Sequence, residues 1–496
     1  LTHGRHHRRT VTPIDQEVSP MSVLTQVLEP LGVTAASDEP ADVVVLHQVP
    51  PAEFVEQLRS VGAVVCTTST AVLQALGVST TPLPAHPSHD PLVADPVYTV
   101  EAGDLTFPLT GAIGIETEQV WATADGIPVA GRVNGLGVLA GRWEDAIADE
   151  NGALFWARTV LGKSDPQVEQ TLHTVLTTPG PHVDHPAVDV IDGSSWQPAH
   201  APDVPINSAD FLRAVAHAGR TLPEPIYDAL VDFVDDAPAA GALLLKNMPL
   251  GDLPPTPEDP LLADKADQVS EFSLLTVGRV LGRPVGYLPE HGGDVVQNIS
   301  PTRRNADRQV STSSKSMLEF HTEAAFHPHR PRYLLLLCLR GDPSAATTLC
   351  SIAAVLDTLS PRSRAVLFQS RFTTGIDESY AGGRSDARSI QRPVLYGDPE
   401  FPKMWLDADL MQGTDPVAQE ALDELARLVR ENATAVTLEA GDLLVVDNDL
   451  AVHGRTPFTP RFDGTDRWLQ RTFVVADHTA ADGSRDGRVI TTRFIA

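Results

Sequence analysis

Two histidines and one glutamate are the residues of this 496-residue chain whose types and spacing point most clearly to chemistry. His321 and Glu323 are two positions apart, so in an extended strand their side chains lie on the same face. His453 lies far along the chain, in the segment 447–455. Two histidines and one carboxylate leave coordination positions open for other ligands, which suits non-haem Fe(II) oxygenases. The pattern predicts an iron site with His321, Glu323 and His453 as metal ligands and catalytic residues.

The segments 321–340, 441–455 and 466–471 resemble, in motif and in order, the clavaminate synthase-like (TauD-type) Fe(II)/2-oxoglutarate oxygenases. This group includes asparagine oxygenase and the arginine hydroxylases. The resemblance runs from about residue 242 to the C-terminus and implies a double-stranded β-helix, or jelly roll. It also implies that the protein uses Fe(II), 2-oxoglutarate and O₂, with succinate and carbon dioxide as coproducts.

The same resemblance implies a 2-oxoglutarate site. Arg467 lies 14 residues after His453 and matches the arginine that pairs with the distal carboxylate of 2-oxoglutarate. A planar guanidinium suits this role, because it binds both oxygens of a carboxylate and stays charged in a cavity. Thr348 matches a hydroxyl that contacts the same carboxylate, and Thr347 takes its place if the alignment slips by one residue.

Substrate-binding residues are expected nearby. Arg471 lies four residues after Arg467, so both face the same side of a strand, and it matches the arginine that binds the α-carboxylate of an amino acid. Asp407 and Asp409 resemble the acid pair that meets the guanidinium in the arginine hydroxylases. Solvent-facing acids before a helix are an equal alternative for this pair.

Two more positions complete the predicted substrate site. Asp377 resembles an acid of a lid loop over the active site. Members of the family often carry Gln where this chain has Glu290, which leaves His291 or Gln297 as the contact to the α-amino group.

The predicted function is hydroxylation of an unactivated carbon of a free polar amino acid, with a basic, arginine-like one expected, in an antibiotic or other specialised-metabolite pathway. Glu323 argues against halogenation, because the related halogenases carry a small residue there so that chloride can bind iron. One alternative is hydroxylation, desaturation or cyclisation of a carrier-tethered or elaborated amino-acid derivative, for which Arg471 would lack its carboxylate partner. Another is a binding protein that senses 2-oxoglutarate without turnover, although the complete triad argues against it.

The elements that position these residues indicate two domains. Residues 207–496 are predicted to form the jelly roll with flanking helices, because short apolar strands dominate there. Gly441-Asp442, between two apolar runs, is typical of a hairpin. The expected strands are 242–246, 295–299, 333–339, 435–438, 443–446 and 471–475, with a long helix at 417–431.

Residues 21–165 are predicted to form an α/β domain with a parallel sheet, because strands at 43–46 and 63–66 alternate with helices from 51 and 67. Further strands are expected at 111–115, 129–133 and 136–140. Residues 166–206 are expected to be a Pro-rich linker without regular structure, and residues 1–20 a disordered or non-native extension.

The α/β domain loosely resembles a degenerate class I glutamine amidotransferase-like domain. Thr67 stands at the position of the nucleophile elbow, and Cys66 lies one residue early. No convincing Cys-His-Glu set follows, although His86 and His89 are available, so the domain is predicted to be non-catalytic. It is expected to serve self-association or the docking of a partner such as a carrier protein.

The composition of the chain disfavours several other classes of partner. With 65 acidic and 37 basic residues the net charge is −28, which disfavours nucleic acid and anionic membranes. No stretch approaches the ~20 apolar residues of a membrane span. There is no signal-peptide pattern at the N-terminus. Only three cysteines occur, Cys66, Cys338 and Cys350, which favours a reducing, cytoplasmic location without disulfides.

Overall fold

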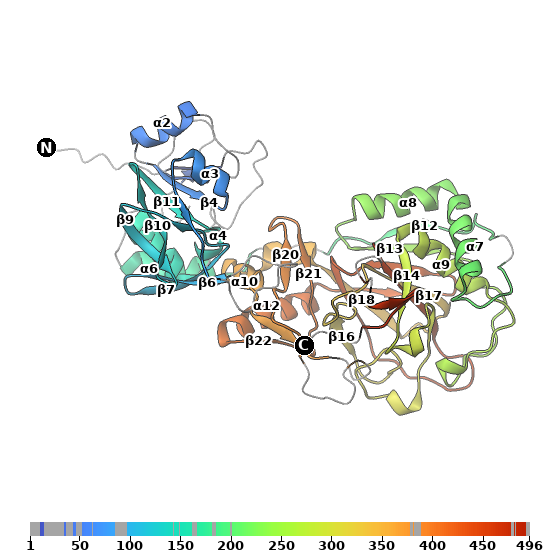
Figure 1. Cartoon of the computed structure of the whole chain (residues 1–496). Coiled ribbons are helices and arrows are strands. Elements are labelled where there is room, and N and C mark those ends of the chain that lie inside the picture. The colour runs from blue at the N-terminus through green and yellow to red at the C-terminus, as the bar shows by residue number, and fades with distance from the viewer. Residues whose placement is uncertain are drawn as a thin grey trace.

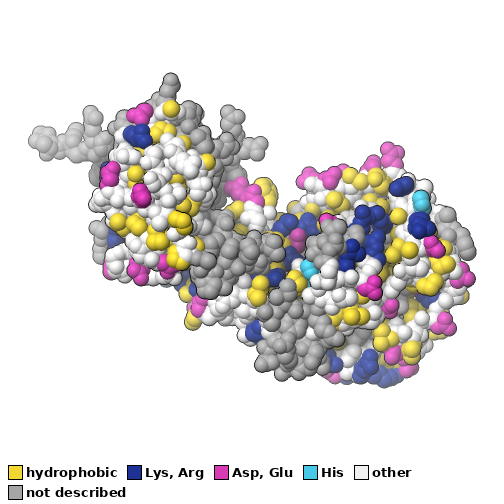
Figure 2. Space-filling model, in the orientation of Figure 1, with side chains coloured by type: hydrophobic (Ala, Val, Ile, Leu, Met, Phe, Trp, Pro, Cys, Tyr) yellow, Lys and Arg dark blue, Asp and Glu magenta, His cyan; other side chains and the backbone are white. Residues whose placement is uncertain are grey.

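In the computed structural model the chain has an N-terminal region built on one large sheet and a C-terminal region built on two (Figure 1). Acidic side chains are spread over the visible surface of both regions, in keeping with the net charge of −28 (Figure 2). The structure describes residues 10–13, 34–35, 43–45, 52–61, 63–84, 97–141, 143–147, 149–160, 166–180, 185–198, 201–376, 380, 388–477, 481 and 483–492.

The N-terminal sheet has nine strands in the order β2-β1-β3-β4-β11-β10-β9-β6-β7. One half is parallel and comprises β1 (Thr10–Pro13), β2 (Thr34–Ala35), β3 (Val43–Val45) and β4 (Val64–Thr67), with β11 parallel to β4. The other half is antiparallel and comprises β6 (Val97–Ala102), β7 (Leu105–Thr110), β9 (Gln119–Ala124), β10 (Ile127–Val133) and β11 (Leu136–Ala140).

The prediction of an all-parallel sheet was therefore wrong for its second half. The turns Asp125-Gly126 and Asn134-Gly135 explain the difference, since all four residues have positive φ, between 49° and 85°. Asp-Gly and Asn-Gly turns of this kind connect antiparallel neighbours with the right-handed twist that strands prefer. The alternation over 43–76 was confirmed, because helices α2 (Ala52–Val61) and α3 (Thr70–Ala75) follow β3 and β4.

Helices cover both faces of this sheet. On one face, α2 and α3 pack against Val65 and Val138 through an apolar core that includes Leu58 and Leu73. On the other face lie α4 (Trp143–Ile147), α5 (Glu150–Phe155), the π-helix η2 (Trp156–Val160) and α6 (Pro166–Thr177). A small two-stranded sheet, β5 (Thr80–Thr81) with β8 (Gly114–Ile115), lies next to β10, and its Ile115 joins the core under α2 and α3.

The expectation that residues 166–206 lack regular structure was also wrong. Helix α6 begins at Pro166, where proline is well tolerated, and its Leu172 and Leu176 are buried in the N-terminal core. Further on, β12 (Asp189–Asp192) pairs in parallel with β13 (Ala242–Lys246). The prolines of this stretch therefore flank a helix and an edge strand.

The C-terminal region contains two facing sheets. The major sheet has the order β12-β13-β24-β17-β26-β14-β28-β27, and the minor sheet the order β16-β25-β18-β23. The major-sheet strands are β14 (Arg283–Tyr287), β17 (Tyr333–Arg340), β24 (Leu443–Asp447), β26 (Trp468–Val475), β27 (Arg485–Asp486) and β28 (Val489–Ile490), with β15 (Gln297–Ile299) pairing on β26. The minor-sheet strands are β16 (Leu318–His321), β18 (Ala346–Ser351), β23 (Thr434–Thr437) and β25 (Ala451–Arg455).

An apolar core lies between the two sheets, where Leu336, Leu444 and Phe473 of the major sheet meet Leu349 of the minor sheet. Helices α7 (Ala209–Ala218), α8 (Glu224–Asp235) and α9 (Val269–Leu281) cover the outer face of the major sheet. Helices α10 (Pro361–Leu367) and α12 (Pro416–Asn432) cover the outer face of the minor sheet. In Figure 1 these two helices lie between the N-terminal sheet and the C-terminal sheets, with α4 and α6 in contact with α10.

The predicted hairpin at Gly441-Asp442 was wrong. Strand β23 pairs with β18 in the minor sheet, whereas β24 pairs with β13 and β17 in the major sheet. Gly441 has a φ of 88° and lies where the chain crosses from one sheet to the other. Two apolar runs around a glycine are compatible with a hairpin and also with a crossover between two sheets. Only the pairing partners of the two strands distinguish these connections.

Candidate active site

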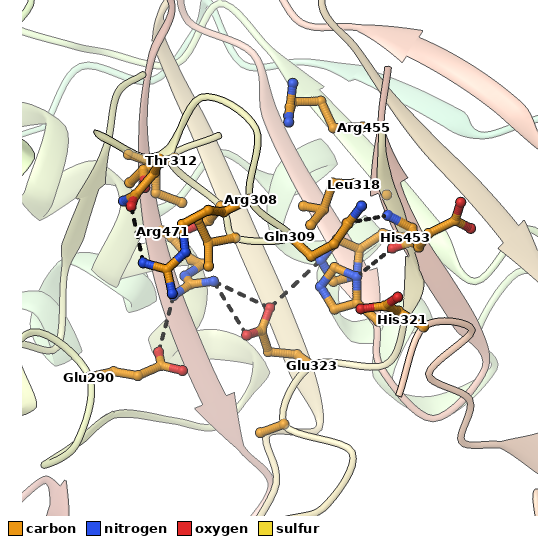
Figure 3. A pocket seen from close by; sticks show the side chains of 18 of the residues that line it. Glu290, Arg308, Gln309, Thr312, Leu318, His321, Glu323, His453, Arg455 and Arg471 are labelled. Carbon is orange, nitrogen blue, oxygen red and sulfur yellow. Dashed lines mark hydrogen bonds and ion pairs between the residues drawn. The ribbon is translucent and has the colours of Figure 1, made fainter. Parts of the chain in front are cut away.

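Antiparallel pairing brings the two histidines together. His321 on β16 is the register partner of His453 on β25, and their ring centroids are 4.3 Å apart. Glu323 follows the end of β16, and its Oε2 lies 3.6 Å from Nε2 of His453. One possible ligand atom from each of the three residues lies within 4.8 Å of the others. Figure 3 shows Glu323 between these histidines and Arg471.

The protonation of the histidines fits a metal site. Nδ1 of His321 donates a hydrogen bond to the backbone oxygen of Glu319 at 2.8 Å, so Nε2 is the ring nitrogen that remains for a metal. Burial, together with His321 and Arg471, holds the pKa of His453 well below its ordinary value and keeps the ring neutral. Among the described residues, buried Nδ1 of His453 has no hydrogen-bond partner. Two imidazoles and a carboxylate are a suitable donor set for Fe(II).

Arg471 lies on strand β26, and Arg467 directly precedes the first residue of that strand. Arg467 and Arg471 are buried and, with Leu469 between them, line the same cavity, as their even spacing predicts. The cavity has a volume of about 820 Å³ and also contains the three residues of the triad. Burial lowers the pKa of Arg467, but a guanidinium stays charged at ordinary pH. The cavity therefore presents two fixed cations beside the triad.

Of the two candidate threonines, Thr347 has its hydroxyl beside Arg467. Nη2 of Arg467 lies 3.4 Å from the Thr347 hydroxyl, and Thr347 lines the cavity. On β18, Thr347 pairs with Arg455 and Leu349 with His453, so these residues share the inner face. Thr348 pairs with Gly454 and faces the other side, where its buried hydroxyl has no hydrogen-bond partner among the described residues.

Among the described residues, Gln297, Glu290 and Glu323 are acceptor side chains that hold Arg471. Gln297 accepts hydrogen bonds from Nε at 3.0 Å and from Nη2 at 2.6 Å. Glu290 accepts from Nη2 at 3.1 Å, and the carboxylate oxygens of Glu323 lie 3.3 and 3.4 Å from Nη1. Burial raises the pKa of Glu290, with Arg471 opposing the shift and Glu323 adding to it. The guanidinium is thus oriented into the cavity before any ligand arrives.

His291 also lines the cavity, next to Glu290. Burial and the nearby Arg471 lower the pKa of His291 to about 4, so its ring is neutral at ordinary pH. Its contact with an α-amino group stays a prediction, as does that of Gln297, whose oxygen is engaged by Arg471. Asp377 lies outside the described residues.

Asp407 and Asp409 both line the cavity, and Asp409 is also exposed to solvent, so their contact with a substrate stays a prediction. Their segment lies along β16, where Asp407 forms an isolated bridge with His321. Oδ1 of Asp407 accepts hydrogen bonds from the backbone of Asp409 at 3.1 Å and of Leu410 at 2.8 Å. Burial raises the pKa of Asp407, against the effect of His321. Asp409 is the more exposed of the two.

Sequence reasoning missed two residues of this site. Glu290 was treated as a departure from the family pattern, whereas it is a direct partner of Arg471. Asn448 was not singled out, although its side chain holds the backbone of Glu323. A signal for Asn448 was present, because it lies between two aspartates directly after an apolar strand, where a buried amide needs partners.

Comparisons with known proteins agree with this geometry. Residues 207–473 match the model of the taurine catabolism dioxygenase TauD, TfdA family. The chain is 35% identical over 339 residues to L-lysine 3-hydroxylase of Catenulispora acidiphila, covering 67% of this chain and 92% of that protein. The structure of asparagine oxygenase with Fe(II), 3-hydroxyasparagine and succinate matches with a TM-score of 0.56 at 35% identity, covering 58% of this chain and 92% of that one. The non-haem iron oxygenase OrfP with Fe and α-ketoglutaric acid matches with a TM-score of 0.53 at 31% identity, covering 58% and 91%.

These matches give no support to the amidotransferase-like resemblance of the N-terminal region, since the family match begins at residue 207. Cys66 is buried within β4, and Thr67 ends that strand. His86 and His89 lie outside the described residues. No helix in the described part of the chain is long and apolar enough to cross a bilayer.

Proposed function

Because this chain belongs to the TauD, TfdA family of dioxygenases, we propose that it hydroxylates a free basic amino acid. When bound, Fe(II) with 2-oxoglutarate and O₂ supplies the oxidising power that converts a C–H bond to C–OH, while 2-oxoglutarate becomes succinate and carbon dioxide. The proposal assigns this activity to residues 207–496. Solved relatives hold Fe(II) and succinate, or Fe and α-ketoglutaric acid, which supports the same cofactors here.

In this proposal the chain divides its cavity between cofactor and substrate. His321, Glu323 and His453 hold the iron through two imidazoles and one carboxylate. Arg467 binds the distal carboxylate of 2-oxoglutarate, and the Thr347 hydroxyl, which already contacts Arg467, lies in reach of the same carboxylate. A charge-assisted hydrogen bond of this kind is about twice as strong as a neutral one.

The observation that carries the substrate proposal is that a guanidinium and two carboxylates from different segments line one cavity. Arg471, oriented by Gln297 and Glu290, offers a guanidinium to the α-carboxylate of an amino acid. Asp407 and Asp409 come from a different segment and line the same cavity with two acids. A molecule that carries a carboxylate at one end and a cation at the other satisfies both sides. Lysine, ornithine and arginine have this form, and the similarity to a lysine 3-hydroxylase supports it.

The experiment compares amino acids that differ in one charge. The iron-loaded chain is incubated with 2-oxoglutarate and O₂, and succinate is measured with lysine, ornithine, arginine, asparagine or norleucine. Norleucine has the apolar chain of lysine without its ammonium group, and lysinamide keeps the ammonium group without the carboxylate. At least one basic amino acid is expected to stimulate succinate release ~10-fold or more over both analogues, because each analogue leaves a buried charge unpaired.

Equal stimulation by norleucine or asparagine would refute a side-chain cation as the recognised group. Equal stimulation by lysinamide would refute a free α-carboxylate and would favour a carrier-tethered or elaborated substrate, which likewise has no free carboxylate. Docking of a carrier on residues 21–165, and self-association through them, stay predictions.

A further inference from the structure

Asn448 is fully buried, and its side chain serves the backbone on both sides of one loop. Its Oδ1 accepts a hydrogen bond from the Glu323 N–H at 2.8 Å. Its Nδ2 donates to the backbone oxygens of Glu323 at 3.1 Å and of Pro331 at 2.9 Å. One amide therefore closes the loop from Glu323 to Pro331 at both ends.

Glu323 needs such a partner because it lies past the end of a strand. Strand β16 ends at His321, and the following Thr322 N–H donates to the Leu406 oxygen at 2.6 Å. Directly after Glu323, Ala324 has a φ of 51°, in the left-handed region, so the chain cannot continue as a strand. A buried backbone N–H and C=O without partners would cost free energy. The Asn448 side chain takes the place of the missing neighbouring strand.

The turn that carries Asn448 is itself firmly held. The Asn448 N–H donates to the Arg332 oxygen at 2.9 Å, and the Asp449 N–H donates to Oδ1 of Asp447 at 2.9 Å. Arg332 forms ion pairs with both of these aspartates. Arg330 forms an ion pair with Asp449 at 2.5 Å. The amide is thus fixed relative to β25, which begins at residue 451 and carries His453.

We propose that Asn448 is a positioning residue for the iron site: it fixes the backbone of Glu323 so that this carboxylate faces His321 and His453, and it thereby sets the affinity of the triad for a divalent metal. The inference rests on the proposed function, which assigns iron to these three residues. Outer residues that orient metal ligands typically contribute 10–100-fold in metal affinity. Asn448 acts through Glu323 and has no assigned contact with iron or substrate.

The test is a Co(II) titration of the full chain, followed by absorbance, with Asn448→Ala beside a matched control. Asn432 is also buried, and it donates to the Leu428 oxygen at 2.8 Å near the end of α12. Asn448→Ala is expected to lower Co(II) affinity ~10–100-fold, whereas Asn432→Ala stays within ~2-fold of the parent chain, because it removes a buried amide that does not contact the triad. If Asn448→Ala does not give folded protein, Asn448→Asp replaces it with the same expectation, since it keeps the volume but loses the donor to two carbonyl oxygens.

The same substitution made in the Glu323→Ala variant distinguishes positioning of Glu323 from a general loss of structure. In Glu323→Ala the carboxylate is absent, so adding Asn448→Ala is expected to leave the remaining Co(II) affinity unchanged within ~2-fold while still lowering the unfolding temperature. An equal loss of affinity in both backgrounds, or an unchanged affinity in Asn448→Ala beside normal binding by the parent chain, would overturn the inference alone. A parent chain whose Co(II) affinity does not respond to His453→Ala would overturn the iron assignment and the inference with it.

Discussion

Nη2 of Arg467 lies 3.4 Å from the hydroxyl of Thr347, and both side chains are buried on the inner side of the cavity. The next residue, Thr348, points to the opposite face of the same strand. One position along a strand therefore decides which threonine accompanies the arginine proposed to bind 2-oxoglutarate. The two residues form a natural matched pair for mutation.

Thr347→Val is expected to raise the KM for 2-oxoglutarate ~10-fold or more, the value of one hydrogen bond to a charged group of about 1.5 kcal/mol. Thr348→Val is expected to leave that KM unchanged. It should also leave the unfolding temperature unchanged or slightly higher, because the buried Thr348 hydroxyl has no partner among the described residues and valine has nearly the same shape. Steady-state kinetics and thermal unfolding of both variants check this, and the reverse order of KM effects would restore Thr348 as the contact.

Arg467 and Arg471 are expected to bind different ligands. Arg471→Ala should weaken binding of the amino-acid substrate by ~30-fold or more, in line with about 2–3 kcal/mol for a charged hydrogen bond, and change 2-oxoglutarate binding by less than ~3-fold. Arg467→Ala should do the opposite. Calorimetric titration of each variant with each ligand measures both constants. Equal losses for the two ligands in either variant would refute the division of roles.

Asp407→Asn and Asp409→Asn test the acidic side of the cavity. Each change keeps the size of the side chain, and Asp407→Asn also keeps an oxygen for the Leu410 N–H. The KM for the basic substrate is expected to rise ~10-fold in each, because one opposite charge is lost. Asp423→Asn, on the exposed side of α12, is the control and should leave the KM unchanged. An unchanged KM in all three variants would show that Asp407 and Asp409 do not recognise the substrate.

A divalent metal is expected to stabilise the folded chain through the triad. Mn(II) at 100 times its Kd should add ~2.7 kcal/mol to the free energy of unfolding, and excess EDTA should remove the gain. His453→Ala should show no such gain, whereas His173→Ala, on the N-terminal helix α6, should show the full gain. Thermal unfolding with and without Mn(II) measures this. Stabilisation of His453→Ala equal to that of the parent chain would place the metal elsewhere.

The grouping of the site could be predicted because simple periodicity governs it. His321 and Glu323 are two residues apart, and Arg467 and Arg471 are four apart, so any extended backbone puts each pair on one face. The choice between Thr347 and Thr348 depends instead on register with β25, which sequence alone does not give. Asn448 is a similar case, since its partner Glu323 lies 125 residues away.

The N-terminal sheet illustrates a different kind of error. The strand and helix alternation over 43–76 was real, and extending it implied parallel neighbours throughout. The signals Asp125-Gly126 and Asn134-Gly135 were present in the sequence and favour antiparallel hairpins. The two turns therefore determine the direction of the later strands, whatever the alternation of the earlier elements. The Asp-Gly and Asn-Gly pairs alone favour a mixed sheet.

The proposed hydroxylase activity is tested most directly by the ratio of hydroxylated amino acid to succinate. The iron-loaded chain is given 2-oxoglutarate, O₂ and the basic amino acid that best stimulates turnover, and mass spectrometry follows the amino acid while succinate is quantified. The proposed hydroxylase activity predicts one hydroxylated amino acid, heavier by one oxygen atom, for each succinate, and neither product from His453→Ala. Succinate without hydroxylated amino acid, or equal turnover by His453→Ala, would contradict it.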